Sequence, residues 1–199
     1  MTDKILLNEE EYVLKESDLP CLITYAEKTG GSHYSVTMVA QMFLAGFKVL
    51  FLTAYPMAKE NFLKQVGESN TNVAFVTNKE ELENYKNAQC ILIESGNEAL
   101  FLEAVNALSN INERVVLLKN IEKFSNEVIE KALTLEKVIL SGHLDECELR
   151  DKIVAKNYSS IVAFSKPEIS LPINIPELEK YTGCLKSRDK EGVVRIKFS

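Results

Sequence analysis

A glycine-containing segment near the start of the chain has the residue types of a phosphate-binding loop. Cys21–Tyr25 is predicted to be a strand, and an apolar stripe at helical spacing begins at Val36. A loop between a strand and a helix can bind phosphate through its backbone N–H groups and the helix N-terminus, and a lysine usually adds its charge. The candidate binding residues are Lys28, Thr29, Gly30, Gly31, Ser32, His33 and Tyr34.

This segment departs from the pattern G-x-x-x-x-G-K-[ST]. Placed without gaps over Glu27–Tyr34, the pattern meets Glu27 and Ser32 at its glycines, His33 at its lysine and Tyr34 at its magnesium-binding hydroxyl. A carboxylate repels phosphate, and a neutral imidazole is too short to replace the lysine. A shift by one residue places Tyr34 at the lysine position, so no frame restores Gly-Lys-Ser/Thr.

Two alternatives stay open for this loop. Lys28 could fold back and supply the missing positive charge to a bound phosphate. In the other interpretation, Gly30 and Gly31 merely turn the chain from the strand into the helix. The sequence therefore leaves open whether any ligand binds here.

Short apolar runs alternate with segments of helical periodicity along most of the chain. The predicted strands are Cys21–Tyr25, Val49–Thr53, Val73–Thr77, Cys90–Ile93, Arg114–Leu118, Val138–Leu140 and Ser160–Phe164. The predicted helices are one from Val36 that ends at Gly46, then Met57–Val66, Lys79–Lys86, Glu98–Leu108, Asn126–Leu135 and Glu146–Ala155. This alternation predicts an α/β domain with a mainly parallel sheet covered on both faces.

The two ends of the chain differ from this pattern. Gly183–Lys186 and Val193–Phe198 flank a charged turn and predict a C-terminal antiparallel hairpin within residues 181–199. Residues 1–18 are acidic and amphipathic, and they are expected to form an N-terminal arm, an edge strand or a surface segment. We therefore expect one domain over residues 1–199.

Composition narrows the classes of partner and compartment. The net charge of −6 disfavours a broadly basic nucleic-acid footprint, so direct nucleic-acid binding is not the favoured expectation. No apolar run approaches the roughly 20 residues that cross a bilayer, and no signal-peptide pattern opens the chain. The four cysteines are far apart and without C-x-x-C spacing, which indicates buried thiols in a reducing compartment. A cytoplasmic protein without membrane contact is expected.

The segment Asp18–Val66 resembles the Walker A region of RecA-like P-loop ATPases, especially DnaB-type helicases and the KaiC and RadA proteins. Gly46–Thr53 is similar to the second strand of that family, and Met57–Phe62 to the stretch that follows it. The resemblance implies a three-layer α/β sandwich of the P-loop NTPase type, with ATP and magnesium as cofactors. In the family a catalytic glutamate stands just before the methionine, where this chain has Tyr55 and Pro56.

Two further parts of the family pattern were compared with this chain. Leu185–Phe198 is similar to the closing hairpin, and Lys186 and Arg188 match a Lys-x-Arg finger that reaches a neighbouring subunit. The resemblance therefore implies a protein partner or self-association through the hairpin. The Walker B aspartate should close an apolar strand, and the two candidate strands end in Glu94 and Lys119. Glu94 could take that role, or it could be a solvated residue at a strand end.

A second polar cluster follows the strand Val138–Leu140. His143 and Cys147 could ligate a metal or form a nucleophile pair. The favoured interpretation is a strand-to-helix turn in which Asp145 caps the next helix. With two histidines in the chain, a multi-histidine metal site is excluded, and no metal is expected.

Three catalytic features are missing together: the loop lysine, the hydroxyl beside it, and the glutamate after the second strand. The leading hypothesis is therefore a catalytically inactive pseudo-ATPase that acts as a binding or assembly module and needs no cofactor. The alternative is a nucleotide-binding ATPase with an unusual Walker A loop that uses ATP with magnesium through Lys28, His33 and Glu94. A third hypothesis is an accessory protein of DNA replication or recombination that keeps the fold for docking.

Overall fold

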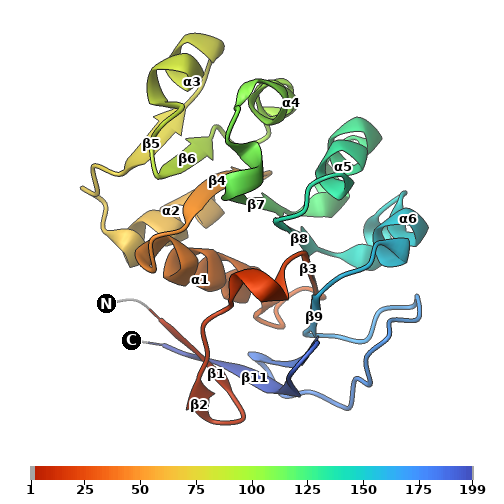
Figure 1. Ribbon diagram of the computed structural model, residues 1–199. Helices are drawn as coiled ribbons and strands as arrows, with labels where there is room; N and C mark the ends of the chain where they lie inside the picture. Colours follow the sequence, from red (N-terminus) through yellow and green to blue (C-terminus); the bar gives the residue numbers. More distant parts are fainter. Residues whose placement is uncertain (1–2, 199) are drawn as a thin grey trace.

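The computed structural model describes residues 3–198, which form one twisted sheet with helices on both faces (Figure 1). The strand order across the sheet is β2-β1-β11-β10-β9-β3-β8-β7-β4-β6-β5. The strands are β1 Lys4–Leu7, β2 Glu10–Glu11, β3 Cys21–Thr24, β4 Lys48–Thr53, β5 Val73–Val76, β6 Cys90–Ile93, β7 Arg114–Lys119, β8 Val138–Gly142, β9 Ser160–Ala163, β10 Thr182–Ser187 and β11 Glu191–Lys197.

The sheet has a parallel part and an antiparallel part. Strands β9, β3, β8, β7, β4, β6 and β5 pair in parallel, in that order. From β9 outward, β10, β11, β1 and β2 pair antiparallel. The predicted mainly parallel sheet with a C-terminal antiparallel hairpin is confirmed, and the N-terminal segment extends it by two strands.

Helices cover the two faces of the sheet in two groups. One apolar cluster joins α1 and α2 to one face, and a second cluster joins α3, α4, α5 and α6 to the other (Figure 1). Because side chains alternate along a strand, Cys21 and Ile23 of β3 enter the first cluster and Leu22 enters the second. The helices are α1 Gly31–Leu44, α2 Pro56–Val66, α3 Lys79–Tyr85, α4 Glu98–Ala107, α5 Asn126–Leu133 and α6 Arg150–Ala155.

The last helix is shorter than the sequence predicted. A 3-10 turn at Leu144–Glu146 precedes it, and α6 begins only at Arg150. Asp145 does not cap this helix, because its Oδ1 accepts a hydrogen bond from the backbone N–H of Glu168 at 2.9 Å. The polar residues after β8 therefore tie the turn to the chain beyond β9, which corrects the expected capping role.

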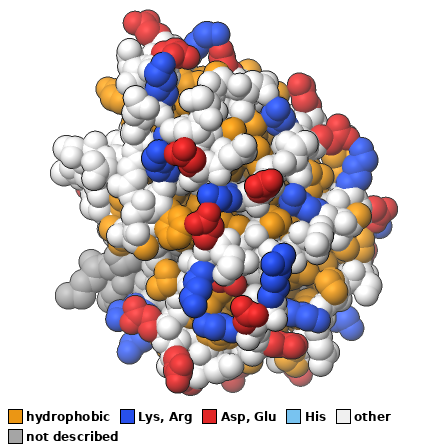
Figure 2. All heavy atoms as spheres, in the orientation of Figure 1, with side chains coloured by type: hydrophobic (Ala, Val, Ile, Leu, Met, Phe, Trp, Pro, Cys, Tyr) orange, Lys and Arg blue, Asp and Glu red, His pale blue; other side chains and the backbone are white. Residues whose placement is uncertain are grey.

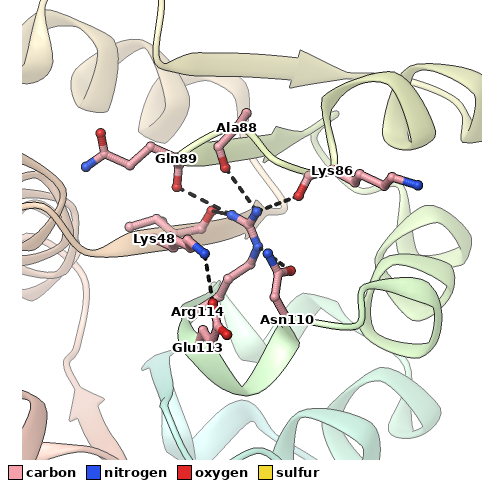
Figure 3. Close-up of polar contacts among 8 residues, drawn as sticks. Lys48, Lys86, Ala88, Gln89, Asn110, Glu113 and Arg114 are labelled. Carbon is pink, nitrogen blue, oxygen red and sulfur yellow. Dashed lines mark hydrogen bonds and ion pairs between the residues drawn. The ribbon is translucent and has the colours of Figure 1, made fainter.

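A buried arginine joins several loops at the amino-terminal end of β7 (Figure 3). The guanidinium of Arg114 is fully buried, and it donates to the backbone oxygens of Lys86 at 2.7 Å and of Ala88 at 3.0 Å. It also donates to the backbone oxygens of Val49 and Gln89 and to the side chain of Asn110. These contacts satisfy the charge with carbonyl dipoles, and they fix the edge of the sheet that lies opposite the cavity described below.

The surface and the thiols agree with the composition. Figure 2 shows acidic and basic side chains interspersed over one face of the molecule. All four cysteines, Cys21, Cys90, Cys147 and Cys184, are buried and free, as predicted. Among the described residues, no helix is long and apolar enough to cross a bilayer.

Candidate functional site

A cavity of about 520 Å³ lies at the carboxyl ends of the central parallel strands. Its walls are the loop after β3, the start of α2, the end of β7 and the chain just before β10. This is the edge at which open α/β sheets bind their ligands, because loops and helix N-termini converge there. The cavity also has the size of a small-molecule site.

The loop after β3 has the backbone of an anion-binding turn. Lys28 and Gly30 have positive φ values of 63° and 101°, and Gly30 is the residue that precedes α1. The backbone N–H of Tyr181 donates to Thr29 O at 2.9 Å, so the chain before β10 braces the loop. A Cβ on Gly30 would come within 2.6 Å of the Tyr181 ring, so this close approach requires glycine.

The start of α1 corrects the frame in which the loop was compared with the phosphate-binding pattern. Since α1 begins at Gly31, Gly30 takes the place of the second glycine, Gly31 that of the lysine and Ser32 that of the hydroxyl residue. Tyr34, which the ungapped comparison put at the hydroxyl position, is fully buried, and its ring contacts Phe164 with centroids 5.0 Å apart. Tyr34 therefore belongs to the core and does not line the cavity.

The position of the missing lysine has no room for a side chain. A Cβ on Gly31 would lie 2.5 Å from the Cβ of Tyr25 and 2.6 Å from its ring, which is closer than real Cβ atoms come. In the corrected frame, Tyr25 itself stands where the pattern has its first glycine. The ring of Tyr25 thus fills the volume that a side chain on the first residue of α1 would enter.

A lysine enters the site from a neighbouring strand instead. Lys119 ends β7, its residue is 2% exposed, and its Nζ donates to Ser32 Oγ at 2.8 Å. The other two partners of this ammonium are Asn120 Oδ1 at 3.2 Å and the Tyr25 hydroxyl at 3.5 Å, and all three are neutral. Burial lowers the pKa of Lys119 to about 8, and the charge of Glu122 opposes that shift.

Lys119 was considered only as the end of a Walker B strand, and its role at the cavity was missed. Glu94, the other candidate, follows β6, and in the sheet β6 is separated from β3 by β4, β7 and β8. Glu94 does not line the cavity, which corrects its assignment as a binding residue. The strand order was needed to choose between the two, although the fully buried pattern of β7 was already the stronger apolar signal.

The other candidate residues of the loop have different surroundings. Lys28, Gly30, Ser32 and His33 line the cavity, whereas Thr29 and Gly31 do not. The hydroxyl of Thr29 donates to Ala26 O at 2.8 Å and stabilises the loop from within. His33 Nε2 lies 2.7 Å from Asp3 Oδ2, which ties the start of α1 to the N-terminal segment.

The residues around His143 do not assemble into a metal centre. His143 Nδ1 lies 3.2 Å from Glu146 Oε1, and the thiol of Cys147 donates to the backbone oxygen of His143 at 3.3 Å. Over residues 3–198, no group of three or more His, Cys, Asp or Glu residues could hold a metal ion. The imidazole of His143 instead packs edge-on against Tyr25, with ring centroids 5.1 Å apart, and lines the cavity.

The hairpin residues lie at the other edge of the sheet. In the pairing of β10 with β9, Ser187 is opposite Ser160 at the start of β9, and Cys184 is opposite Ala163 at its end. Lys186 and Arg188 are therefore exposed near the amino ends of the parallel strands, far from the cavity of their own chain. Contact of these two residues with a neighbouring subunit stays a prediction.

No family model and no curated protein matches the sequence, but solved structures share its fold. The genome packaging NTPase B204 from Sulfolobus turreted icosahedral virus 2, in complex with AMPPCP, has a TM-score of 0.59 at 12% identity, over 92% of this chain and 99% of that one. EssC (ATPases 2 and 3) from Geobacillus thermodenitrificans has a TM-score of 0.56 at 13% identity, over 98% of this chain and 40% of that one.

A third solved structure is the pCW3 conjugation coupling protein TcpA with ATPgS. Its TM-score is 0.54 at 11% identity, over 98% of this chain and 66% of that one. These likenesses show that the chain has a P-loop NTPase fold. The residues of the site described above, rather than the fold, must carry any statement about activity.

Proposed function

We propose that this protein is a RecA-like P-loop protein that binds a phosphate-bearing ligand, in the first place a nucleotide, and does not hydrolyse ATP. The observation that carries the proposal is Lys119 at the end of β7, where a P-loop NTPase has the aspartate that supports magnesium. A cation at that position favours a phosphate group and removes a requirement of the hydrolytic reaction.

Support for ligand binding comes from the shape and charge of the cavity. Three lysines, Lys28, Lys119 and Lys180, line it together with one carboxylate, Glu27, in a chain whose net charge is −6. The loop after β3 and the N-terminus of the 14-residue helix α1 meet at its floor. A local excess of positive charge in an acidic protein indicates an anionic ligand.

Support for inactivity comes from the lack of groups that activate water. Of the described residues that line the cavity, Glu27 is the lone carboxylate, and it lies on the exposed side of the loop. Tyr55 and Pro56 stand where the family has its catalytic glutamate, and Tyr55 lines the cavity with its side chain half exposed. Phosphoryl transfer needs both a positioned nucleophile and charge stabilisation, and this site offers at most the second.

Paired measurements on the purified protein test this proposal. ATP turnover with magnesium should equal that of buffer, while calorimetric titration should detect binding of ADP or ATP. A matched variant, Glu27→Gln, removes the one carboxylate of the cavity and should bind the nucleotide more tightly without gaining turnover. Turnover that disappears in Lys28→Ala would instead support an ATPase with an unusual Walker A loop.

We also propose that the protein works as a binding or assembly module through its C-terminal hairpin. The exposed residues Lys186 and Arg188 support this idea, since they match the Lys-x-Arg finger of the resembling family. Sedimentation of the wild type should show self-association or a partner complex that the double variant Lys186→Glu, Arg188→Glu loses. A setting in DNA replication or recombination remains a prediction from the resemblance alone.

A further inference from the structure

The cavity is built for an anion but not for the divalent cation that usually accompanies a nucleotide in this fold. Magnesium takes oxygen ligands in octahedral geometry, and in P-loop NTPases the loop hydroxyl and a carboxylate at the end of the neighbouring strand support it. Here Ser32 is the hydroxyl residue, and the neighbouring strand β7 ends in Lys119. A protonated amine has no lone pair for a metal, and it repels one.

The hydroxyl of Ser32 is already in contact with a cation. Lys119 Nζ donates to Ser32 Oγ at 2.8 Å, and Asn120 Oδ1 holds the same ammonium from its other side at 3.2 Å. Asn120 is itself positioned, because its backbone N–H donates to Ser141 O at 2.7 Å and its φ of 67° directs the chain away from β7. The two oxygens nearest to a metal position are thus engaged by the lysine.

The ammonium is also kept at one place by the aromatic ring that excludes the ordinary P-loop lysine. Tyr25 lies against Gly31, and its hydroxyl accepts from Lys119 Nζ at 3.5 Å. The same Nζ lies 5.9 Å from the centroid of the Tyr25 ring. Tyr25 therefore closes the usual route for a lysine from α1 and borders the route from β7.

We propose that the ammonium of Lys119 takes the place of the metal ion at this site, so that the protein binds a nucleoside diphosphate or triphosphate as its metal-free anion. The inference rests on the proposed function and adds the ionic form of the ligand and the residue that contacts its phosphates. The cavity residues Lys28 and Lys180 reinforce the preference for the more highly charged, metal-free ligand.

Magnesium should therefore act on this protein in the direction opposite to that in an ATPase. Chelation of the phosphates by Mg²⁺ lowers the negative charge of the ligand and brings a second cation toward the lysine. We expect ADP to bind the wild type in EDTA, and to bind severalfold more weakly in excess magnesium. Pyrophosphate should behave in the same way if the phosphates carry the interaction.

The experiment is a calorimetric titration of the full chain with ADP and with pyrophosphate, each in EDTA and in excess Mg²⁺. The variant Lys119→Met should bind ADP in EDTA about 10 to 100 times more weakly, the range expected for the loss of a charge-assisted hydrogen bond. Lys156→Met is the matched control. Its half-buried ammonium donates to Leu133 O and Leu135 O, remote from the cavity, and the affinity should not change.

Each result has one meaning for the two proposals. Binding that requires magnesium, or is strengthened by it, would overturn the inference and leave the proposed nucleotide binding intact. Unchanged affinity in Lys119→Met would overturn it as well. The absence of binding by ADP, ATP and pyrophosphate in both buffers would sink the proposed function together with the inference. The magnesium comparison uses only the wild type, so it decides the question even if the variant fails to fold.

Discussion

The first and last residues of strand β7 are both buried cations, and the protein surrounds them in different ways. Arg114, at the amino end, donates to four backbone oxygens and to Asn110, so its guanidinium is enclosed by acceptors. Lys119, at the carboxyl end, has three neutral side-chain partners and borders a cavity of about 520 Å³.

The difference separates a cation that stabilises the fold from one that is available to a ligand. Arg114 remains charged at all accessible pH values, and its donors are used within the protein. Lys119 is desolvated without a carboxylate among its hydrogen-bond partners, which is why its pKa falls to about 8. An anion in the cavity would supply the missing counter-charge. Removal of the two side chains should therefore change stability with opposite sign.

The largest effect is expected from Arg114→Met. This variant leaves the backbone oxygens of Val49, Lys86, Ala88 and Gln89 buried without their donor, so the free energy of unfolding should fall by about 3–5 kcal/mol. Urea denaturation measures it. Lys48→Met is the control, because the pair of Lys48 with Glu113 is exposed and should contribute at most about 1 kcal/mol. A loss of similar size in both variants would contradict the role given to Arg114.

A smaller loss is expected from Gly31→Ala at the cavity. The new methyl group would overlap Tyr25, so the free energy of unfolding should fall by about 1–3 kcal/mol even though alanine favours a helix. The double variant Gly31→Ala, Tyr25→Gly removes the overlap, and its loss should be less than the sum of the two single losses. Additive losses in thermal or urea unfolding would mean that Tyr25 does not fill the position of the lysine.

The pH dependence of stability should reveal Lys119 directly. Its pKa is about 8 in the folded chain and 10.5 ordinarily, so between these values the unfolded chain binds more protons. The stability of the wild type relative to Lys119→Met should therefore rise with pH across this window, by up to about 1.4 kcal/mol per pH unit. Urea titrations at pH 7 to 10 test this, and a constant difference between the two proteins would show that Lys119 titrates normally.

The smallest effect is expected from Lys119→Met at neutral pH. Loss of a buried charge that has no ion pair should offset the loss of its three hydrogen bonds, and the free energy of unfolding should rise by about 1 kcal/mol. Such a gain, together with weaker ADP binding, would identify a residue retained for its ligand. A loss comparable to that of Arg114→Met would place Lys119 among the structural cations and remove the contrast between the two ends of β7.

The sequence by itself determined the elements and the class of fold. Local apolar runs and helical stripes located β3 to β9 and the C-terminal hairpin within a residue or two, because strand and helix periodicities are local properties. It also located the loop after β3 and showed that no lysine follows its glycines. Only the short 3-10 turn at Leu144–Glu146 displaced a predicted helix start.

The tertiary structure alone decided which residues form the site. The start of α1 at Gly31 set the frame of the loop, and this depends on Tyr25 and Tyr181 packing against the glycines from either side. The strand order placed the end of β7 beside the loop and the end of β6 away from it, which a one-dimensional pattern cannot express. Lys119 and Ser32 are 87 residues apart in the chain, and their contact exists only because parallel strands bring their carboxyl ends to one edge of the sheet.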